Sequence, residues 1–349
     1  MATVLGLMVA LWALGAVFGV PGRVRLVTVA VLWLAVVLAQ LVLPAGATLR
    51  EATGGRAEPW LVLGGVAALA LGYRALLRRI RARGAVPPAP PAPGSFGAAE
   101  LERYARHILL REVGGPGQKR LKAARVLVVG AGGLGSPAIL YLAAAGVGTI
   151  GIVDDDVVEN SNLQRQIIHA DDRIGLPKVA SAAMAVKALN PFVTVVPHRL
   201  RLDEATARDL IAEYDLVLDG TDNFDTRYLV NRVCAALGKP LVAAAMTQWE
   251  GQISVYDPAQ GAPCYECVFP VRPAPGLVPA CAEAGVIAPL PGILGSMMAL
   301  EALKLLVGAG QPLRGRLLIH DGLFGETRTI ATRRRPDCAA CGHLSQPVV

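Results

Sequence analysis

Residues Arg125–Gly135, RVLVVGAGGLG, decide the fold of the larger part of this chain. The first five residues form an uninterrupted apolar run rich in valine, which is typical of a strand buried on both faces of a parallel sheet. The run passes directly into a glycine-rich turn, and an apolar helix is predicted to follow over Leu134–Ala145. A strand, a glycine-rich turn and a helix in this order predict a nucleotide-binding βα unit.

The alternation of strands and helices continues on the C-terminal side of this unit. Further strands are predicted at 149–153, 193–196, 215–218 and 240–244, with helices at 177–189, 204–214 and 224–237. This repeat predicts an α/β fold with a doubly wound, mostly parallel sheet and a Rossmann-like nucleotide-binding half. Additional antiparallel strands are predicted at 251–256, 317–321 and 327–331, and the remaining helices at 98–113, 117–124 and 292–307.

The glycine-rich turn and the end of the second strand supply the first candidate site residues. Gly130, Gly132, Gly133 and Gly135 let the backbone turn tightly and approach a phosphate at the N-terminus of a helix. Asp154 ends the second strand, where an acidic residue is placed to bind ribose hydroxyls. These residues alone fit an NAD-dependent oxidoreductase as well as an ATP-binding enzyme.

Two basic residues downstream favour a triphosphate. Ser161-Asn162-Leu163-Gln164-Arg165-Gln166 follows the second strand, and Lys178 opens the next helix. A triphosphate carries about four negative charges at neutral pH, and phosphoryl chemistry depends on positioning and charge neutralisation. Arg165 and Lys178 are suited to that task, although either residue taken singly also fits a surface ion pair.

A carboxylate follows the strand at 215–218, in the segment Asp219-Gly-Thr-Asp222-Asn223. Carboxylates at the C-terminal ends of parallel strands lie in the ligand crevice, and Mg²⁺ prefers one or two of them together with phosphate oxygens. Asp222 is therefore the candidate Mg²⁺ ligand. The alternative is that Asp222 caps the helix that begins near Asn223, and Asp219 can take either role.

Four of the six cysteines form two Cys-x-x-Cys pairs, Cys264 with Cys267 and Cys338 with Cys341. Two such pairs predict a tetrahedral Cys₄ zinc site. Disulfides are the alternative, which a reducing cytosol disfavours, and a redox dithiol would need only one pair. Cys234 is predicted to lie in the core of an apolar helix.

The net charge of +7 comes entirely from the first quarter of the chain, where residues 1–85 hold nine Arg against two acidic residues. The charges of the remainder balance, so the sequence excludes the basic face that a nucleic-acid partner would need. Three apolar runs in the same region predict a membrane anchor over residues 1–84, with spans at about 3–20, 26–46 and 60–77. A cleaved signal peptide or buried core helices are the alternatives.

The placement of arginines predicts the orientation of this anchor. Arg23 and Arg25 occupy the first loop, and five more Arg follow the third run between Arg74 and Arg83. We therefore expect the N-terminus outside, and the catalytic domain in the cytoplasm, on a multi-pass protein of the inner (cytoplasmic) membrane. Residues 85–97 are predicted to be a proline-rich linker, and residues 98–349 the catalytic domain.

The sequence from residue 98 to residue 342 resembles the MoeB/ThiF/HesA family, the bacterial relatives of ubiquitin-activating enzymes. The resemblance does not extend to residues 1–97. It rests on Glu102–His107, Gly117-Gln118, the glycine turn, Ser161–Gln166, Lys178, Asn190-Pro191, Thr221–Phe224 with Arg227, Glu250–Gln252, both cysteine pairs and Cys281–Val286.

This resemblance implies an ATP-dependent adenylyltransferase of the molybdopterin-synthase type, without a fused rhodanese domain. Its substrate would be the C-terminal Gly-Gly of a ubiquitin-like sulfur carrier of the molybdopterin or thiamine pathway, and a cysteine desulfurase or rhodanese would donate the sulfur. Arg106 would reach into the site of a second subunit, which implies a homodimer. The expected contacts to ATP or Mg²⁺ are Gly133, Asp154, Asn162, Arg165, Lys178, Asp222 and Asn223.

Two questions stay open at the level of sequence. Cys281 fits either a thiol that attacks the acyl-adenylate during sulfur transfer or a small packed residue of a loop. The rival functions are an NAD-dependent oxidoreductase on the same glycine turn and a non-catalytic, membrane-tethered binder of a ubiquitin-like protein. Arg165 and Lys178 argue against the oxidoreductase, which leaves this basic pair unexplained. Asp222 and Arg165 argue against the non-catalytic binder, because their loss would have indicated it and both are present.

Overall fold

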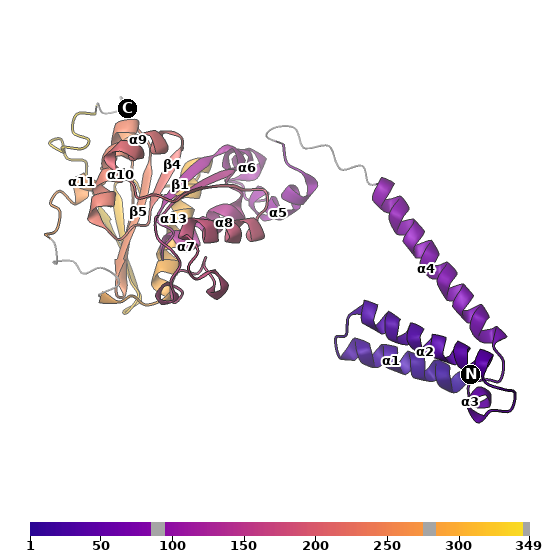
Figure 1. Ribbon diagram of the computed structural model, residues 1–349. Helices are drawn as coiled ribbons and strands as arrows, with labels where there is room; N and C mark the ends of the chain where they lie inside the picture. Colours follow the sequence, from indigo (N-terminus) through magenta and orange to yellow (C-terminus); the bar gives the residue numbers. More distant parts are fainter. Residues whose placement is uncertain (85–94, 275–283, 345–349) are drawn as a thin grey trace. The chain divides into compact units, whose positions relative to one another are not determined.

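The computed structural model describes residues 1–84, 95–274 and 284–344 (Figure 1). The chain divides into two compact units, Met1–Pro90 and Pro91–Val349, and the division falls within the expected linker. Most of that linker, residues 85–94, and the candidate residue Cys281 lie outside the described residues.

The second unit is built on one eight-stranded sheet with the order β3-β2-β1-β4-β5-β6-β7-β8. The first five strands in this order pair in parallel, and the last three pair antiparallel. The predicted mixed sheet is confirmed. The strands are β1 (Arg125–Val129), β2 (Thr149–Val153), β3 (Thr194–His198), β4 (Leu216–Asp219), β5 (Leu241–Thr247), β6 (Glu250–Tyr256), β7 (Arg316–Asp321) and β8 (Glu326–Ala331).

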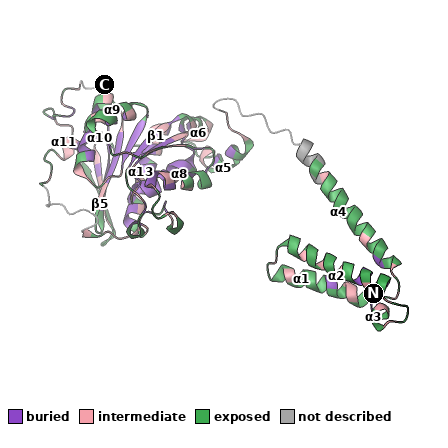
Figure 2. Ribbon diagram, in the orientation of Figure 1, coloured by how far each residue is buried: buried purple, intermediate pink, exposed green. Residues whose placement is uncertain are grey.

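Helices cover both faces of this sheet, and each face has its own apolar core. One core joins β1 and β2 to α6 (Gly114–Ala123), α7 (Gly135–Ala145), α8 (Lys178–Leu189) and α13 (Pro289–Val307). The other joins β1 and β4 to α9 (Glu204–Ala212), α10 (Phe224–Leu237) and α11 (Tyr265–Val268). The central strands are buried on both faces (Figure 2), as their continuous apolar runs predict.

The helix predicted at 98–113 is shorter than expected, because α5 (Ala98–Ile108) ends before a turn and α6 begins at Gly114. Gly114 has φ +57°, a left-handed conformation that glycine adopts readily, so the chain changes direction there. Three short 3₁₀ turns, Asn160–Asn162, Asp171–Arg173 and Pro258–Gln260, complete the described elements of this unit.

The first unit consists of three long helices and one short one: α1 (Ala2–Val17), α2 (Gly22–Val42), α3 (Thr48–Ala52) and α4 (Glu58–Gly84). Large apolar side chains are exposed along the three long helices. Most of the ribbon of these helices has the colour of exposed residues in Figure 2. The short α3 was not predicted. It lies in a polar junction, where Thr53 accepts hydrogen bonds from Gln40 at 2.6 Å and, through its carbonyl, from Trp60 at 3.0 Å.

By length and composition, three described helices can cross a bilayer: α2, the Glu58–Leu77 part of α4, and α13. Half of α13 is buried in the second unit, where it packs on the sheet, so this helix belongs to the domain core. The 16 residues of α1 extend about 24 Å, which is shorter than a hydrocarbon layer of about 30 Å. Membrane crossing by the first unit therefore stays a prediction.

Candidate active site

A cavity of 840 Å³ opens at the C-terminal ends of the parallel strands, where doubly wound sheets bind their ligands. The glycine turn, the end of β2, the start of α8 and the segment after β4 all contribute to its wall. The candidate residues that line it are Gly130, Gly132, Gly133, Asp154, Arg165, Lys178, Asp222 and Asn223.

The glycine turn is held tightly against the sheet. Gly130 has φ +92°, so a side chain at this position would strain the backbone. A Cβ atom added at Gly135, the first residue of α7, would lie 1.9 Å from the carbonyl oxygen of Gly130. Gly135 does not line the cavity in the described structure; its role is close packing of the helix on the turn.

Asp154 is committed to the backbone of the glycine turn. Its Oδ2 accepts a hydrogen bond from the Ala131 N–H at 2.8 Å, and its Oδ1 accepts one from the Asp156 N–H at 2.9 Å. Burial raises the pKa of Asp154, while nearby Lys178 and these two donors act in the opposite direction. The carboxylate therefore orients the turn and also faces the cavity, where the predicted ribose contact would be made.

The two predicted cations reach the cavity from different segments. Lys178 is the first residue of α8, is 6% exposed, and places Nζ 2.7 Å from Oδ2 of Asp156. Arg165 lies half-buried in the segment after β2 and donates from Nη1 to the Ser161 carbonyl at 3.1 Å. The rest of its guanidinium is available to a ligand, because that bond uses one of five N–H donors.

Asp222 does not cap α10, so the cap and the candidate Mg²⁺ ligand are different residues. Asn223 is the N-cap of α10, since its Oδ1 accepts from the Thr226 N–H at 2.8 Å. Asp219 is buried and accepts from both the N–H and the hydroxyl of Thr221. Asp222 is exposed, lines the cavity and has no hydrogen bond or ion pair within the described residues, so its carboxylate is available for a cation.

Besides Gly135, three predicted residues lie outside the cavity lining in the described structure. Ser161 and Asn162 belong to the 3₁₀ turn Asn160–Asn162 and do not line the cavity. Asn162 accepts from the Glu159 N–H at 3.4 Å, and thus supports the segment that carries Arg165. Arg106 is exposed on α5, away from the cavity lining of its own chain.

Several residues that line the cavity were not predicted from the sequence. Asp155 and Asp156 lie beside Asp154, and the run of three Asp at a strand end was a signal for them. Gln166 is 4% exposed and its Oε1 has no hydrogen-bond partner within the described residues. Asp225 and Arg272 also line the cavity and form an ion pair at 2.6 Å. The pair joins segments 47 positions apart, so sequence spacing could not predict it.

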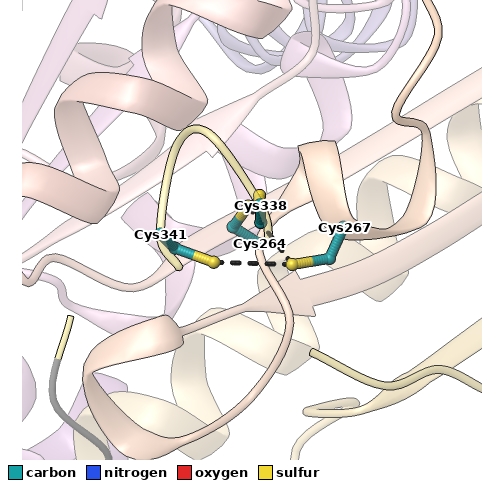
Figure 3. Close-up of side chains that lie close together, drawn as sticks. All are labelled: Cys264, Cys267, Cys338 and Cys341. Atoms are coloured by element: carbon teal, nitrogen blue, oxygen red, sulfur yellow. Dashed lines mark hydrogen bonds between the residues drawn. The ribbon is translucent and has the colours of Figure 1, made fainter. Parts of the chain in front are cut away.

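The four paired cysteines converge in a separate buried cluster (Figure 3). Sγ of Cys264 lies 3.7 Å from that of Cys267 and 3.5 Å from that of Cys338, and Sγ of Cys267 lies 3.4 Å from that of Cys341. Sulfur atoms about 2.3 Å from a zinc ion stand about 3.8 Å apart in a tetrahedron. The cluster therefore fits the predicted zinc ion.

The protonation state of the four thiols is coupled to metal binding, because a metal ion binds thiolates. Burial raises the pKa of Cys264, and it raises the pKa of Cys341 to about 11. Arg335 donates its backbone N–H to Sγ of Cys267 at 3.4 Å, which stabilises a thiolate. A divalent cation would displace the thiol protons and hold the four sulfur atoms together.

Comparison with known proteins assigns the chain to a family. The ThiF family model matches residues 104–340. The SAMP-activating enzyme E1 of Haloferax volcanii is 52% identical over 248 residues, which are 71% of this chain and 91% of that protein. The sulfur carrier protein adenylyltransferase of Thermus thermophilus is 50% identical over 247 residues, which are 70% of this chain and 91% of that protein.

A solved structure has the same fold. The crystal structure of E. coli MccB with MccA-N7isoASN has a TM-score of 0.61 and 24% identity, covering 68% of this chain and 74% of that chain. At this identity the likeness shows the fold alone. From the family match and the two sequence relatives it follows that the chain belongs to the ThiF family.

Proposed function

We propose that this protein uses ATP to adenylate the C-terminal glycine of a ubiquitin-like sulfur carrier protein and so activates it for thiocarboxylate formation. One observation carries the proposal: a single cavity brings together the glycine turn, two cations from different segments and an uncommitted carboxylate. Two relatives, a SAMP-activating enzyme and a sulfur carrier protein adenylyltransferase, support the same activity.

The reaction requires positioning more than a protein nucleophile. An oxygen of the carrier's C-terminal carboxylate attacks the α-phosphorus of ATP. The bond from this phosphorus to the bridging oxygen of the β-phosphate breaks, and pyrophosphate leaves with that oxygen and its electron pair. The turn around Gly132 and Gly133 would accept the phosphates, while Arg165 and Lys178 would neutralise the charge that builds up.

Asp222 fits a magnesium ion, because its exposed carboxylate faces the cavity and has no partner within the described residues. Mg²⁺ would be held by Asp222 and by phosphate oxygens, and would supply further neutralisation of the triphosphate. Lys178 forms an ion pair with Asp156, and it would exchange this carboxylate for phosphate oxygens when ATP binds.

The test is pyrophosphate exchange. The full chain in detergent, with ATP, Mg²⁺ and a carrier ending in Gly-Gly, should incorporate labelled pyrophosphate into ATP. Asp222→Ala should lower the exchange rate by about 10²-fold or more, because it removes a charge contact that the transition state needs.

Asp225→Ala is the matched control, since Asp225 is another exposed carboxylate of the same cavity but is already paired with Arg272. It should retain exchange within a few fold. If Asp222→Ala exchanges as fast as the control, the magnesium assignment is wrong. If the wild-type chain binds ATP but catalyses no pyrophosphate exchange in the presence of carriers that end in Gly-Gly, the proposed function itself is wrong.

The assembly of the protein forms part of the same proposal. Arg106, exposed on α5, would complete the cavity of a second copy in a homodimer, and a cysteine desulfurase or rhodanese would supply the sulfur. A mixture of Arg106→Ala subunits with Asp222→Ala subunits should recover exchange if Arg106 acts across the dimer. No recovery in a mixed dimer would place Arg106 in the site of its own chain.

The N-terminal unit would hold the enzyme at the inner (cytoplasmic) membrane with the catalytic domain in the cytoplasm. Exposed apolar side chains along α1, α2 and α4 support this proposal, because a layer of lipid would cover them. The cysteine cluster would hold a structural zinc ion, which joins α11 to the C-terminal segment.

A further inference from the structure

His169 lies outside the cavity lining, yet it joins the segments that supply the phosphate contacts. It is 7% exposed and uses both ring nitrogens: Nε2 lies 3.0 Å from the Ala131 carbonyl oxygen and Nδ1 lies 2.9 Å from Oγ of Ser181. Ala131 belongs to the glycine turn, and Ser181 lies on α8, three residues beyond Lys178.

The third connection of His169 is through its own backbone. The His169 N–H donates to the Gln166 carbonyl at 3.1 Å, within the segment that places Arg165 and Gln166 on the cavity wall. One buried imidazole thus bonds the glycine turn and the helix of Lys178 to the segment of Arg165.

The hydrogen-bond partners define the state of the ring. A carbonyl oxygen can only accept, so Nε2 carries the proton, and Nδ1 then accepts from the Ser181 hydroxyl. Burial lowers the pKa of His169, and the neighbouring cations Lys178 and Arg173 lower it further, although the bond to Ala131 opposes them. The imidazole is therefore neutral at physiological pH.

Asp154 and His169 fix the two successive peptide groups on either side of the Ala131 Cα. Asp154 accepts from the Ala131 N–H at 2.8 Å, and His169 donates to the Ala131 carbonyl. The peptide groups of Gly132 and Gly133 follow directly, and both glycines line the cavity. Because the Ala131 carbonyl and the Gly132 N–H belong to one planar peptide group, the bond from His169 fixes the direction of that N–H.

We propose that His169 is a positioning residue for the triphosphate of ATP, holding the glycine turn, the Arg165 segment and the Lys178 helix in register. This inference rests on the proposed function, because it names a residue that supports the ATP site. His169 touches no substrate itself and acts through Ala131 and Ser181.

Two near-isosteric variants separate the two ring nitrogens. In His169→Gln the side-chain amide nitrogen can occupy the position of Nε2 and donate to Ala131. In His169→Asn the shorter amide reaches only the position of Nδ1 and Ser181. ATP and adenosine affinities are measured by calorimetry on the full chain in detergent with Mg²⁺, and thermal unfolding shows that each variant is folded.

His169→Asn should weaken ATP binding by about 10-fold, the equivalent of one hydrogen bond at roughly 1.4 kcal/mol. Its affinity for adenosine, which has no phosphates, should stay within about 3-fold of wild type, and His169→Gln should bind ATP within about 3-fold of wild type. The control is His198→Asn, which removes a ring hydrogen bond to Tyr214 at 3.0 Å outside the cavity lining and should leave ATP affinity unchanged.

The outcomes are distinguishable. Equal ATP affinities for the Asn and Gln variants, or equal losses for ATP and adenosine, would overturn the positioning role while the proposed function stands. Failure of the wild-type chain to bind ATP would overturn the proposed function and this inference with it. If the Asn variant does not fold, a Gln variant that binds ATP 10-fold or more weakly than wild type refutes the role of the Nε2 donor.

Discussion

Replacement of Gly135 by alanine should destabilise the catalytic domain, because the packing of α7 on the glycine turn leaves no room for a methyl group. The added Cβ would lie 1.9 Å from the carbonyl oxygen and 2.9 Å from the carbonyl carbon of Gly130. Both neighbours are backbone atoms of a residue at φ +92°, so a side-chain rotation cannot relieve the contact.

The expected size of the effect follows from the cost of overpacking. Insertion of one carbon into a packed region costs about 1–3 kcal/mol, and a contact with backbone places Gly135→Ala at the upper end. Alanine regains up to about 1 kcal/mol of helix propensity, less at the first position of a helix. A net loss of about 2–3 kcal/mol lowers the Tm of a domain of this size by roughly 4–12 °C.

Calorimetry of the full chain in detergent measures this change in Tm. The transition of the catalytic domain is identified as the one that ATP shifts to higher temperature. Gly292→Ala is the matched control, since Gly292 lies in the first turns of α13 and has no atom within 4 Å of an added Cβ. The control should keep its Tm or gain slightly. A Gly135→Ala variant with the Tm of wild type would refute the close contact between α7 and the turn.

Three further predictions concern the metal, the membrane and the remaining cysteine. Metal analysis of the full chain should return about one zinc per chain. Zinc binding should release protons and weaken as the pH falls, because burial keeps the thiols of Cys264 and Cys341 protonated without a metal. A folded, active protein without metal would contradict this prediction. A reporter that works only outside the cytoplasm should be active when inserted within Thr48–Glu58 and silent after Arg83, and the opposite pattern would refute the orientation read from the arginines. Cys281→Ala should form adenylate but stop sulfur transfer if Cys281 carries the acyl group, whereas full thiocarboxylate formation would leave it a loop residue.

The sequence determined most of the fold, because its local signals agree with one another. The buried valine run at β1, the glycine turn after it and the repeated strand and helix patterns each depend on neighbours a few residues apart. The observed strands lie within a few residues of the predicted ones, as at β4 and β5. Helix ends were harder to place, since the end of α5 depends on the turn before Gly114 as much as on periodicity.

The sequence also predicted many of the residues that line the cavity, but only the tertiary structure shows which hydrogen bonds their side chains form. Asp222 and Asn223 are adjacent, and either can cap α10; the cap fell to Asn223 because its side chain meets the Thr226 N–H. His169 was not selected at all, since nothing near it in the chain shows that Ala131 and Ser181 will lie on either side of its ring. Local patterns fix which segments fold, whereas hydrogen bonds between residues 38 positions apart exist only after the sheet has brought the segments together.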